Sequence, residues 1–258
     1  DKCPENTERA SAITRCYPTL ESRVAFNIAD INEFHTEEKF DIICTELDGG
    51  FGNNEGAKRR YGSLQRLLSR NGLMIPARVR ISMVPVSLPL LLESALKTAT
   101  IPFHNQKAVL DPYSRYYAVF GVDRSALLAK PALIDEFSTT GKIVEDGEYR
   151  ADFTIKKVEE GTTTRSLTGF IGYFSHDLVA GWRRSISFTN NPASPPTSWG
   201  QVYFPVESFA VRRGDVVQVR MCECITPAGQ IPHYRWSVGK NGTSHGVYSN
   251  EQNQFRRV

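Results

Sequence analysis

The stretch DIICTELDGGFGNNE, from Asp41 to Glu55, decides the fold of this chain and the chemistry open to it. Its first five residues, Asp41 to Thr45, form a short apolar run that predicts a strand buried on both faces. The glycines that follow tolerate positive φ at little cost, so the backbone can curl back and bring Glu46 and Glu55 together. We call residues 46–55 the glycine hook. Two converging carboxylates can share a proton, bind a metal or grip a cation.

The residues alone leave these readings of the glycine hook open. A metal would need ligands beyond Glu46 and Glu55; Asp48 is available, but no histidine is close to them in the sequence. An acid and base pair, as in glycosidases, would need one carboxyl group in an apolar pocket. Gripping a cation needs only two ionised carboxylates and a planar, permanently charged group such as a guanidinium. Two unrelated surface charges are the plain alternative.

Length and composition limit the class of protein. A chain of 258 residues with 40% hydrophobic residues can form one large domain or two small ones, each with a core. The net charge of +3 is too small to argue for direct nucleic-acid binding. No apolar run of membrane-spanning length occurs, and the first residues lack the apolar segment of a signal peptide. Five cysteines without ligand spacing predict reduced thiols in a cytoplasmic, and also nuclear, protein.

The first part of the chain alternates between helix and strand patterns. Pro4 to Tyr17 predicts a helix, and Arg23 to Ile28 and then Asp41 to Thr45 predict strands. Leucines at helical spacing after the hook predict a helix that stops at Asn71-Gly72, and Leu73 to Val84 reads as strand again. This alternation predicts an open, mainly parallel α/β sheet that binds ligands beyond the carboxyl ends of its strands.

The second part of the chain has a different pattern. Leu88 to Lys97 predicts a helix, and from Tyr149 onward short strand-like runs follow one another, among them ADFTIKKV, LTGFIGYF, QVYFPV, VVQVRMCECI and HYRWSV. Short strands at this spacing predict an antiparallel barrel or sandwich. Arg213-Gly214-Asp215 predicts a hairpin turn within it.

Single residues add further candidates, each with a plain alternative. Asp1 could accept ribose hydroxyls at a strand end, or it could be a charged chain terminus. Asp30 could accept an adenine amino proton with Ile31 against the ring, or it could cap a helix. Trp199 stands in a proline-bounded loop, PPTSWGQVYFP, and could lie flat over a cation, a contact worth about 0.5–2 kcal/mol. It could equally fill the seam between the two parts.

Together these segments resemble the protein arginine methyltransferases over nearly the whole chain. Asp41 to Glu55 is similar to the double-glutamate loop of that family, and FGNNE and LTGFIGYF look most like its type II, symmetric-dimethylating branch. In TSW, residues 197–199, Ser198 replaces the histidine that type I enzymes carry, and NGLMIPARV is similar to the segment that joins the family's two domains.

The resemblance implies a fold and an activity. The fold would be the C-terminal half of a Rossmann-like S-adenosylmethionine-binding domain in residues 1–77. An antiparallel β-barrel for substrate binding and dimerisation would follow in residues 78–258. The activity would be transfer of methyl groups from S-adenosylmethionine to arginine guanidinium nitrogens of protein substrates, with symmetric dimethylation. By position, the family's roles fall on Glu46 and Glu55 as the arginine-gripping pair, Trp199 with Ser198 beside it as the substrate stack, and Asp1, Lys2, Asp30 and Ile31 as cofactor contacts.

The chain also departs from the family. The glycine-rich cofactor motif expected just before Asp1 is absent, and GAKRRYG after Glu55 replaces the Ser-Pro-Glu of the symmetric branch. We therefore expect an upstream portion, without which the stretch should bind cofactor poorly, or else a non-catalytic paralogue or scaffold that keeps the barrel. The implied partners are arginine-containing, glycine–arginine-rich protein segments, a second copy of the chain, and a propeller-type partner protein. No metal, membrane or nucleic acid is implied.

Overall fold

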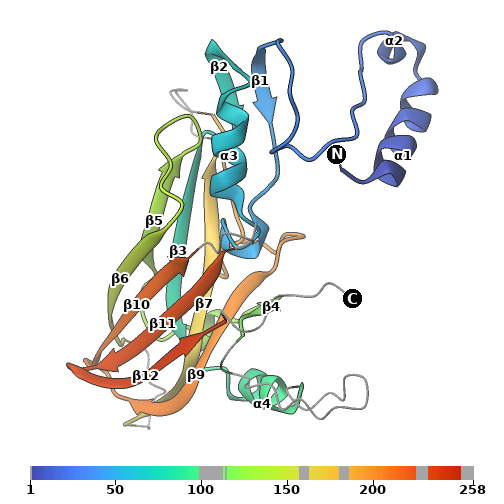
Figure 1. Ribbon diagram of the computed structural model, residues 1–258. Helices are drawn as coiled ribbons and strands as arrows, with labels where there is room; N and C mark the ends of the chain where they lie inside the picture. The colour runs from blue at the N-terminus through green and yellow to red at the C-terminus, as the bar shows by residue number, and fades with distance from the viewer. Residues whose placement is uncertain are drawn as a thin grey trace, which may run out of the picture.

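The computed structural model describes residues 2–98, 113, 115–156, 163–179, 186–224 and 232–250 (Figure 1). Its helices are α1 (Pro4–Arg15), α2 (Pro18–Glu21), α3 (Ala57–Gln65) and α4 (Pro89–Thr98), with 3-10 turns η1 (Gly49–Phe51) and η3 (Arg124–Ala126). Its strands are β1 (Phe40–Cys44), β2 (Leu68–Ile75), β3 (Arg78–Val86), β4 (Tyr117–Val119), β5 (Ala132–Ser138), β6 (Gly147–Thr154), β7 (Arg165–Asp177), β8 (Ser187–Thr189), β9 (Gln201–Val211), β10 (Val216–Cys224), β11 (His233–Lys240) and β12 (Thr243–Ser249).

A small parallel unit carries the glycine hook. β1 and β2 run parallel, with register from the pair Phe40–Leu68 to the pair Cys44–Ile75, and the chain between them passes through the hook and α3. Parallel neighbours need a crossover connection, and α3 supplies it. The predicted α/β character of the first part is confirmed.

The prediction that the strand at residues 41–45 is buried on both faces is wrong. In β1 only Ile43 is buried, whereas Ile42 is 60% exposed. Ile43 shares one core cluster with Leu64 of α3. The described sheet has two strands and the helix packs on one face, so the opposite face meets no apolar layer.

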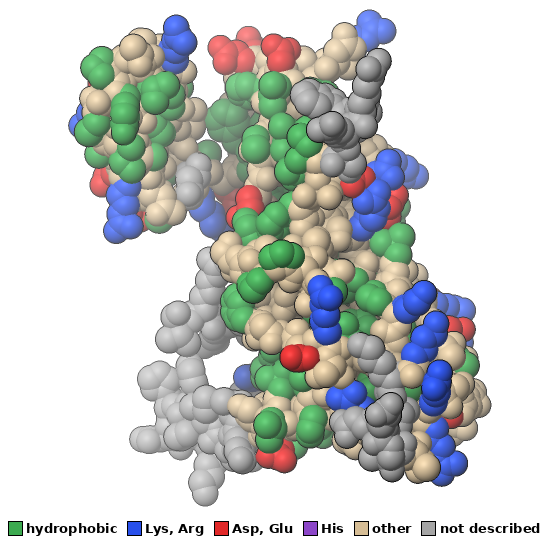
Figure 2. Space-filling view, turned by 180° about the vertical axis from the view of Figure 1, so that it is seen from behind, with side chains coloured by type: hydrophobic (Ala, Val, Ile, Leu, Met, Phe, Trp, Pro, Cys, Tyr) green, Lys and Arg blue, Asp and Glu red, His purple; other side chains and the backbone are tan. Residues whose placement is uncertain are grey.

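An arm made of α1 and α2 stands apart from the β1–β2 sheet (Figure 1). The helix predicted from Pro4 is confirmed as α1, with proline at its start, where the missing N–H costs nothing. The strand predicted for residues 23–28 is wrong, because those residues belong to no strand in the described structure. Figure 2 shows hydrophobic side chains gathered on this arm. The large exposed apolar residues of the arm and of the segment that follows it are Ile13, Tyr17, Leu20, Val24, Phe26 and Ile28.

Two antiparallel sheets form the rest of the molecule. One has the order β12-β11-β10-β6 and the other β4-β9-β7-β3-β5, with β8 added to β7. Both sheets contribute to one core, where the rings of Phe204 on β9 and Trp236 on β11 meet edge to face at 5.4 Å. The antiparallel β architecture is confirmed. Its strands form two described sheets, so the closure of a barrel stays a prediction.

Local turn signals misled in two places. Asn71-Gly72 was predicted to stop a helix, but α3 already ends at Gln65 and these residues lie inside β2. Arg213-Gly214-Asp215 does form a turn, with φ of +94° at Gly214, but it is not a hairpin. The strands that it joins, β9 and β10, belong to different sheets, so the turn carries the chain from one layer to the other. A turn sequence specifies the bend and not the partner of the next strand.

The hook inserts one aromatic side chain into the core between the sheets. Phe51 is 1% exposed, and its ring packs at 5.0 Å from Phe204 and 5.5 Å from Tyr234. β7 makes room for that ring with Gly172, where an added Cβ would lie 2.3 Å from a Phe51 ring carbon. The position of the hook is therefore fixed by core packing.

We expect Gly172→Ala to lower the free energy of unfolding by about 1–3 kcal/mol, because the added methyl must displace a fully buried ring. Gly62→Ala is the matched control. Gly62 lies inside α3 with no atom within 4 Å of an added Cβ, so alanine there should stabilise by about 0.5–1 kcal/mol. Chemical denaturation of both variants measures the difference, and equal stabilities would contradict the assigned packing of Phe51.

Candidate active site

The glycine hook is a tight curl in which Gly49 packs against the residues near the end of the hook. Gly49 and Gly52 have φ of +62° and +81°, a region that glycine adopts far more readily than other residues. A Cβ on Gly49 would lie 2.7 Å from Cγ of Glu55 and 2.7 Å from Oδ1 of Asn54. Gly49, inside the curl, thus packs against Asn54 and Glu55 near its end, while the approach of Glu46 to Glu55 stays a prediction.

Glu46 and the tryptophan loop, residues 195–200, are brought together from opposite halves of the chain. The indole Nε1–H of Trp199 donates a hydrogen bond to Oε1 of Glu46 at 3.0 Å, although the residues are 153 positions apart. Trp199 is half-buried and its ring meets Phe188 edge to face at 5.1 Å. Ser198 beside it is exposed. Trp199 therefore does pack at the seam between the two parts, and it does so against the hook.

The second glutamate faces a different aromatic group. Glu55 is half-buried. The burial of Tyr116, together with the negative charge of Glu55, raises the pKa of Tyr116 to about 12. Burial, the charge of Asp48 and, more weakly, that of Glu46 raise the pKa of Tyr61 far above its ordinary value. Among the described residues, no lysine or arginine forms an ion pair with Glu46 or Glu55. Both carboxylates can accept donors from outside the chain.

Asp48 of the hook forms a buried pair with an imidazole, that of His176, which sequence reasoning missed. Asp48 is 1% exposed and accepts from the hydroxyl of Tyr61 at 3.3 Å to each carboxylate oxygen. Nε2 of His176, on β7, lies 3.0 Å from Asp48 Oδ2, a close electrostatic contact whose direction does not satisfy hydrogen-bond geometry. The absence of a nearby histidine in the sequence was misleading, because β7 brings one from 128 positions away. No group of residues in the described ranges is arranged to hold a metal ion.

A buried polar network anchors the far end of the hook to the β-sheets. Lys58 on α3 is 2% exposed, and its Nζ lies 2.7 Å from Glu223 on β10 and 2.8 Å from Asp135 on β5. Asn53 of the hook accepts from the Lys58 backbone N–H at 2.7 Å and donates to Glu223. Burial alone would lower the pKa of Lys58, but the two carboxylates outweigh it and raise that pKa. The ammonium therefore stays charged in the core.

The predicted cofactor contacts are placed in part. Asp1 lies outside the described residues, and Ile31 packs at the edge of the core. Nζ of Lys2 lies 3.8 Å from Oδ2 of Asp30, while Asp30 Oδ1 accepts from the backbone N–H of Asn32 at 3.0 Å. This backbone hydrogen bond, helped by the positive charges of Lys2 and Arg60, lowers the pKa of Asp30. Asp30 therefore caps a turn instead of a helix, and it stays ionised.

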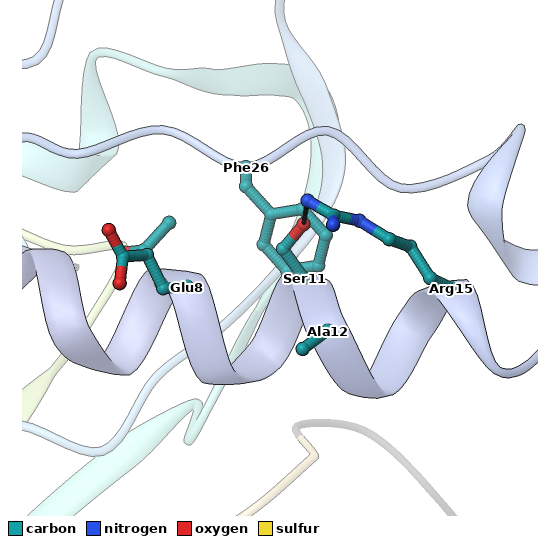
Figure 3. Close-up of a pocket in the computed structure, with 6 residues that line it drawn as sticks. Glu8, Ser11, Ala12, Arg15 and Phe26 are labelled. Atoms are coloured by element: carbon teal, nitrogen blue, oxygen red, sulfur yellow. Dashed lines mark hydrogen bonds between the residues drawn. The ribbon is translucent and has the colours of Figure 1, made fainter.

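A separate hollow lies on the arm. Six residues line it, and Figure 3 shows Arg15 hydrogen-bonded to Ser11 on α1, with Phe26 facing them from the following segment. It has a volume of about 470 Å³ and contains none of the predicted site residues.

In the described part of the chain, no helix is long and apolar enough to cross a membrane.

Comparison of the sequence with known proteins identifies relatives. No protein-family model matches the chain. The chain is 27% identical over 226 residues to Protein arginine N-methyltransferase 5 of Xenopus laevis, covering 86% of this chain and 34% of that protein. It is 25% identical over 222 residues to the protein of the same name from Oryza sativa subsp. indica, covering 84% and 32%. The chain thus spans about a third of the length of these curated relatives.

Solved structures show the same fold. Trypanosoma brucei PRMT1, solved as an enzyme-prozyme heterotetrameric complex with AdoHcy, matches with a TM-score of 0.79 and 15% identity, over 96% of this chain and 80% of that one. Arabidopsis thaliana Protein Arginine Methyltransferase 10 matches with a TM-score of 0.74 and 17% identity, over 95% and 80%. In sequence and in fold, this chain is similar to the protein arginine methyltransferases, as its double-glutamate and tryptophan loops predicted.

Proposed function

We propose that this chain forms the arginine-binding part of an S-adenosylmethionine-dependent protein arginine N-methyltransferase. One observation carries the proposal: a single glycine curl holds Glu46 and Glu55, and the indole of Trp199 closes on Glu46 from the tryptophan loop. Neither glutamate is neutralised by a described basic side chain. A planar cation supplied by a substrate fits this arrangement better than a metal does, since metal ligands are not grouped in the described ranges.

The two glutamates would orient and polarise a substrate guanidinium. Carboxylates bind guanidinium through paired, charge-assisted hydrogen bonds, which fix the plane of the group. Holding the reacting nitrogen in a near-attack position supplies several kcal/mol of the barrier. The ionised pair also stabilises positive charge that grows on that nitrogen, and Glu46 or Glu55 can accept the proton that leaves it. The face of Trp199 offers a cation–π contact to the same group.

Lys2 and Asp30 fit the cofactor that this reaction needs. Asp30 stays ionised and offers a carboxylate oxygen toward amino or hydroxyl donors, as an adenosine group presents. Ile31 adds an apolar surface next to it. S-adenosylmethionine, when bound, supplies the methyl group. The AdoHcy in the Trypanosoma brucei structure supports this choice.

Finer features follow from the resemblance. FGNNE and TSW support a type II enzyme that forms symmetric dimethylarginine on glycine–arginine-rich segments. The enzyme-prozyme complex supports assembly with a second copy or a related subunit, and a propeller-type protein is a further proposed partner. We also propose that the two sheets belong to a β-barrel domain beginning near residue 78. The five cysteines, which form no disulfide in the described structure, support a cytoplasmic or nuclear location.

The protein that carries this chain should methylate a glycine–arginine-rich peptide in the presence of S-adenosylmethionine. Mass spectrometry of the peptide, with separation of symmetric from asymmetric dimethylarginine, measures the product. Peptide binding without any methylation would point instead to a non-catalytic paralogue or scaffold. Formation of asymmetric dimethylarginine would support the methyltransferase activity but overturn the type II assignment.

Asp30→Ala should weaken binding of S-adenosylhomocysteine by about tenfold or more, because it removes a charge-assisted acceptor. Isothermal titration calorimetry measures the change. Asp41→Ala is the control, since that exposed acid on β1 accepts from the hydroxyl of Ser69 at 3.1 Å and is not one of the proposed cofactor contacts. An Asp30→Ala variant with the affinity of the parent protein would remove Asp30 from the cofactor site.

A further inference from the structure

Asn190 joins the glycine hook to the tryptophan loop. Its side chain is 1% exposed, and its Nδ2 donates to the carbonyl oxygen of Gly50 at 2.8 Å and to that of Gly200 at 2.7 Å. Its Oδ1 accepts the backbone N–H of Phe174, on β7, at 2.8 Å. Both amide hydrogens and the carbonyl oxygen are thus used, each toward a different segment of the chain.

The two segments that Asn190 joins carry the two groups that meet at the site. Gly50 is in the hook four residues after Glu46, and Gly200 directly follows Trp199. The backbones approach so closely that a Cβ on Gly50 would lie 2.8 Å from the carbonyl oxygen of Gly200. Two carbonyl oxygens at such a junction repel each other unless a donor lies between them, and the Asn190 amide supplies that donor.

We propose that Asn190 is the positioning residue that holds Trp199 against Glu46 and so sets the geometry of the arginine clamp. It acts through the two loops and does not touch the substrate. The inference rests on the proposed function for its catalytic consequence, whereas the position of Trp199 can be measured without any reaction. A buried, fully satisfied amide confers one arrangement on the loops, because any shift leaves polar groups unpaired.

Asn190→Ala and Asn190→Asp test the proposal. The aspartate variant has nearly the same size and keeps an acceptor for Phe174, but its second carboxylate oxygen would face the carbonyls of Gly50 and Gly200. A residue that only fills space would therefore tolerate aspartate, whereas a bridging donor would not. We expect both variants to lose about 100-fold in kcat/KM toward the arginine peptide, as for a small displacement of catalytic groups. Their affinity for S-adenosylhomocysteine should stay within about twofold, because the Asn190 side chain bonds Gly50, Gly200 and Phe174 and none of the proposed cofactor contacts.

The second measurement is acrylamide quenching of Trp199 fluorescence in a Trp182→Phe background. Trp236 is fully buried, so the quenched signal should come from Trp199, and a Trp199→Phe variant shows what remains without it. Quenching should increase at least about twofold in both Asn190 variants, because loss of the bridge frees the indole from Glu46. Asn191→Ala is the matched control, since its side chain bonds Ala193 N–H within its own segment. It should leave quenching and kcat/KM unchanged.

The quenching result decides whether Asn190 positions Trp199. Unchanged quenching of Trp199 in both Asn190 variants would overturn the positioning role, whatever their activity. A parent protein without methyl transfer would refute the proposed function. The quenching result would still show whether the Asn190 hydrogen bonds to Gly50 and Gly200 hold Trp199 in place. If both variants fail to fold, Gly50→Ala separates the same two loops from the hook side. Increased quenching in that variant supports the bridge, and parental quenching overturns it.

Discussion

Glu46→Gln should reduce methyl transfer to an arginine peptide by at least about 10²- to 10³-fold, the cost of removing one preorganised charge from a transition state. Glutamine keeps the shape of the side chain, and its amide oxygen can still accept the indole N–H of Trp199. The loss therefore reports the negative charge and not the packing. Glu55→Gln should have an effect of the same size, since the proposed clamp uses both carboxylates on one guanidinium.

The control for this pair is Glu145→Gln, an exposed acid in the segment between β5 and β6. It should leave the rate unchanged. Calorimetry with S-adenosylhomocysteine should give the parental affinity in all three variants, which separates loss of the clamp from loss of the fold. Normal turnover in Glu46→Gln and Glu55→Gln would refute the assignment of the hook as the arginine clamp.

Lys58→Met should lower the free energy of unfolding by about 3–5 kcal/mol, the range for breaking a buried ion pair by removing one partner. The ammonium lies between Glu223 and Asp135 at 2.7 and 2.8 Å, and Tyr149 bonds it as well. Methionine fills similar volume but leaves two carboxylates facing each other in the core. Urea or guanidinium denaturation, with the midpoint and slope fitted together, measures the loss.

Lys2→Met provides the comparison, because that lysine is 65% exposed and pairs with Asp30 at 3.8 Å. It should change stability by no more than about 1 kcal/mol. The double variant Lys58→Met with Glu223→Gln should recover part of the loss, since it also removes one of the uncompensated charges. If Lys58→Met were as mild as Lys2→Met, the buried network between α3 and the sheets would be disproved.

Much of the fold was readable from short stretches of sequence. Proline at the start of α1 and the apolar spacing of Tyr61 and Leu64 in α3 identified helices, and the apolar runs of β7, β9 and β10 identified strands. The errors fell where an element depends on its neighbours. Residues 23–28 have strand composition but no described partner, and Arg213-Gly214-Asp215 bends the chain toward another sheet. Strand pairing is a long-range event that local composition does not encode.

The sequence by itself determined the glycine hook, because positive φ at Gly49 and Gly52 is a local property of those residues. It also supplied the residue types of an arginine clamp, Glu46, Glu55 and Trp199. Only the tertiary structure decided that Trp199 bonds Glu46, a contact between residues 153 positions apart.

The supporting residues were likewise visible only in three dimensions. Asn190 is 140 positions from Gly50, and Lys58 is 165 positions from Glu223. Nothing about an isolated asparagine or lysine shows that it will be buried among polar partners. Such residues are stable in the interior only because the folded chain pairs each polar group there, and that pairing is set by the packing of the whole molecule.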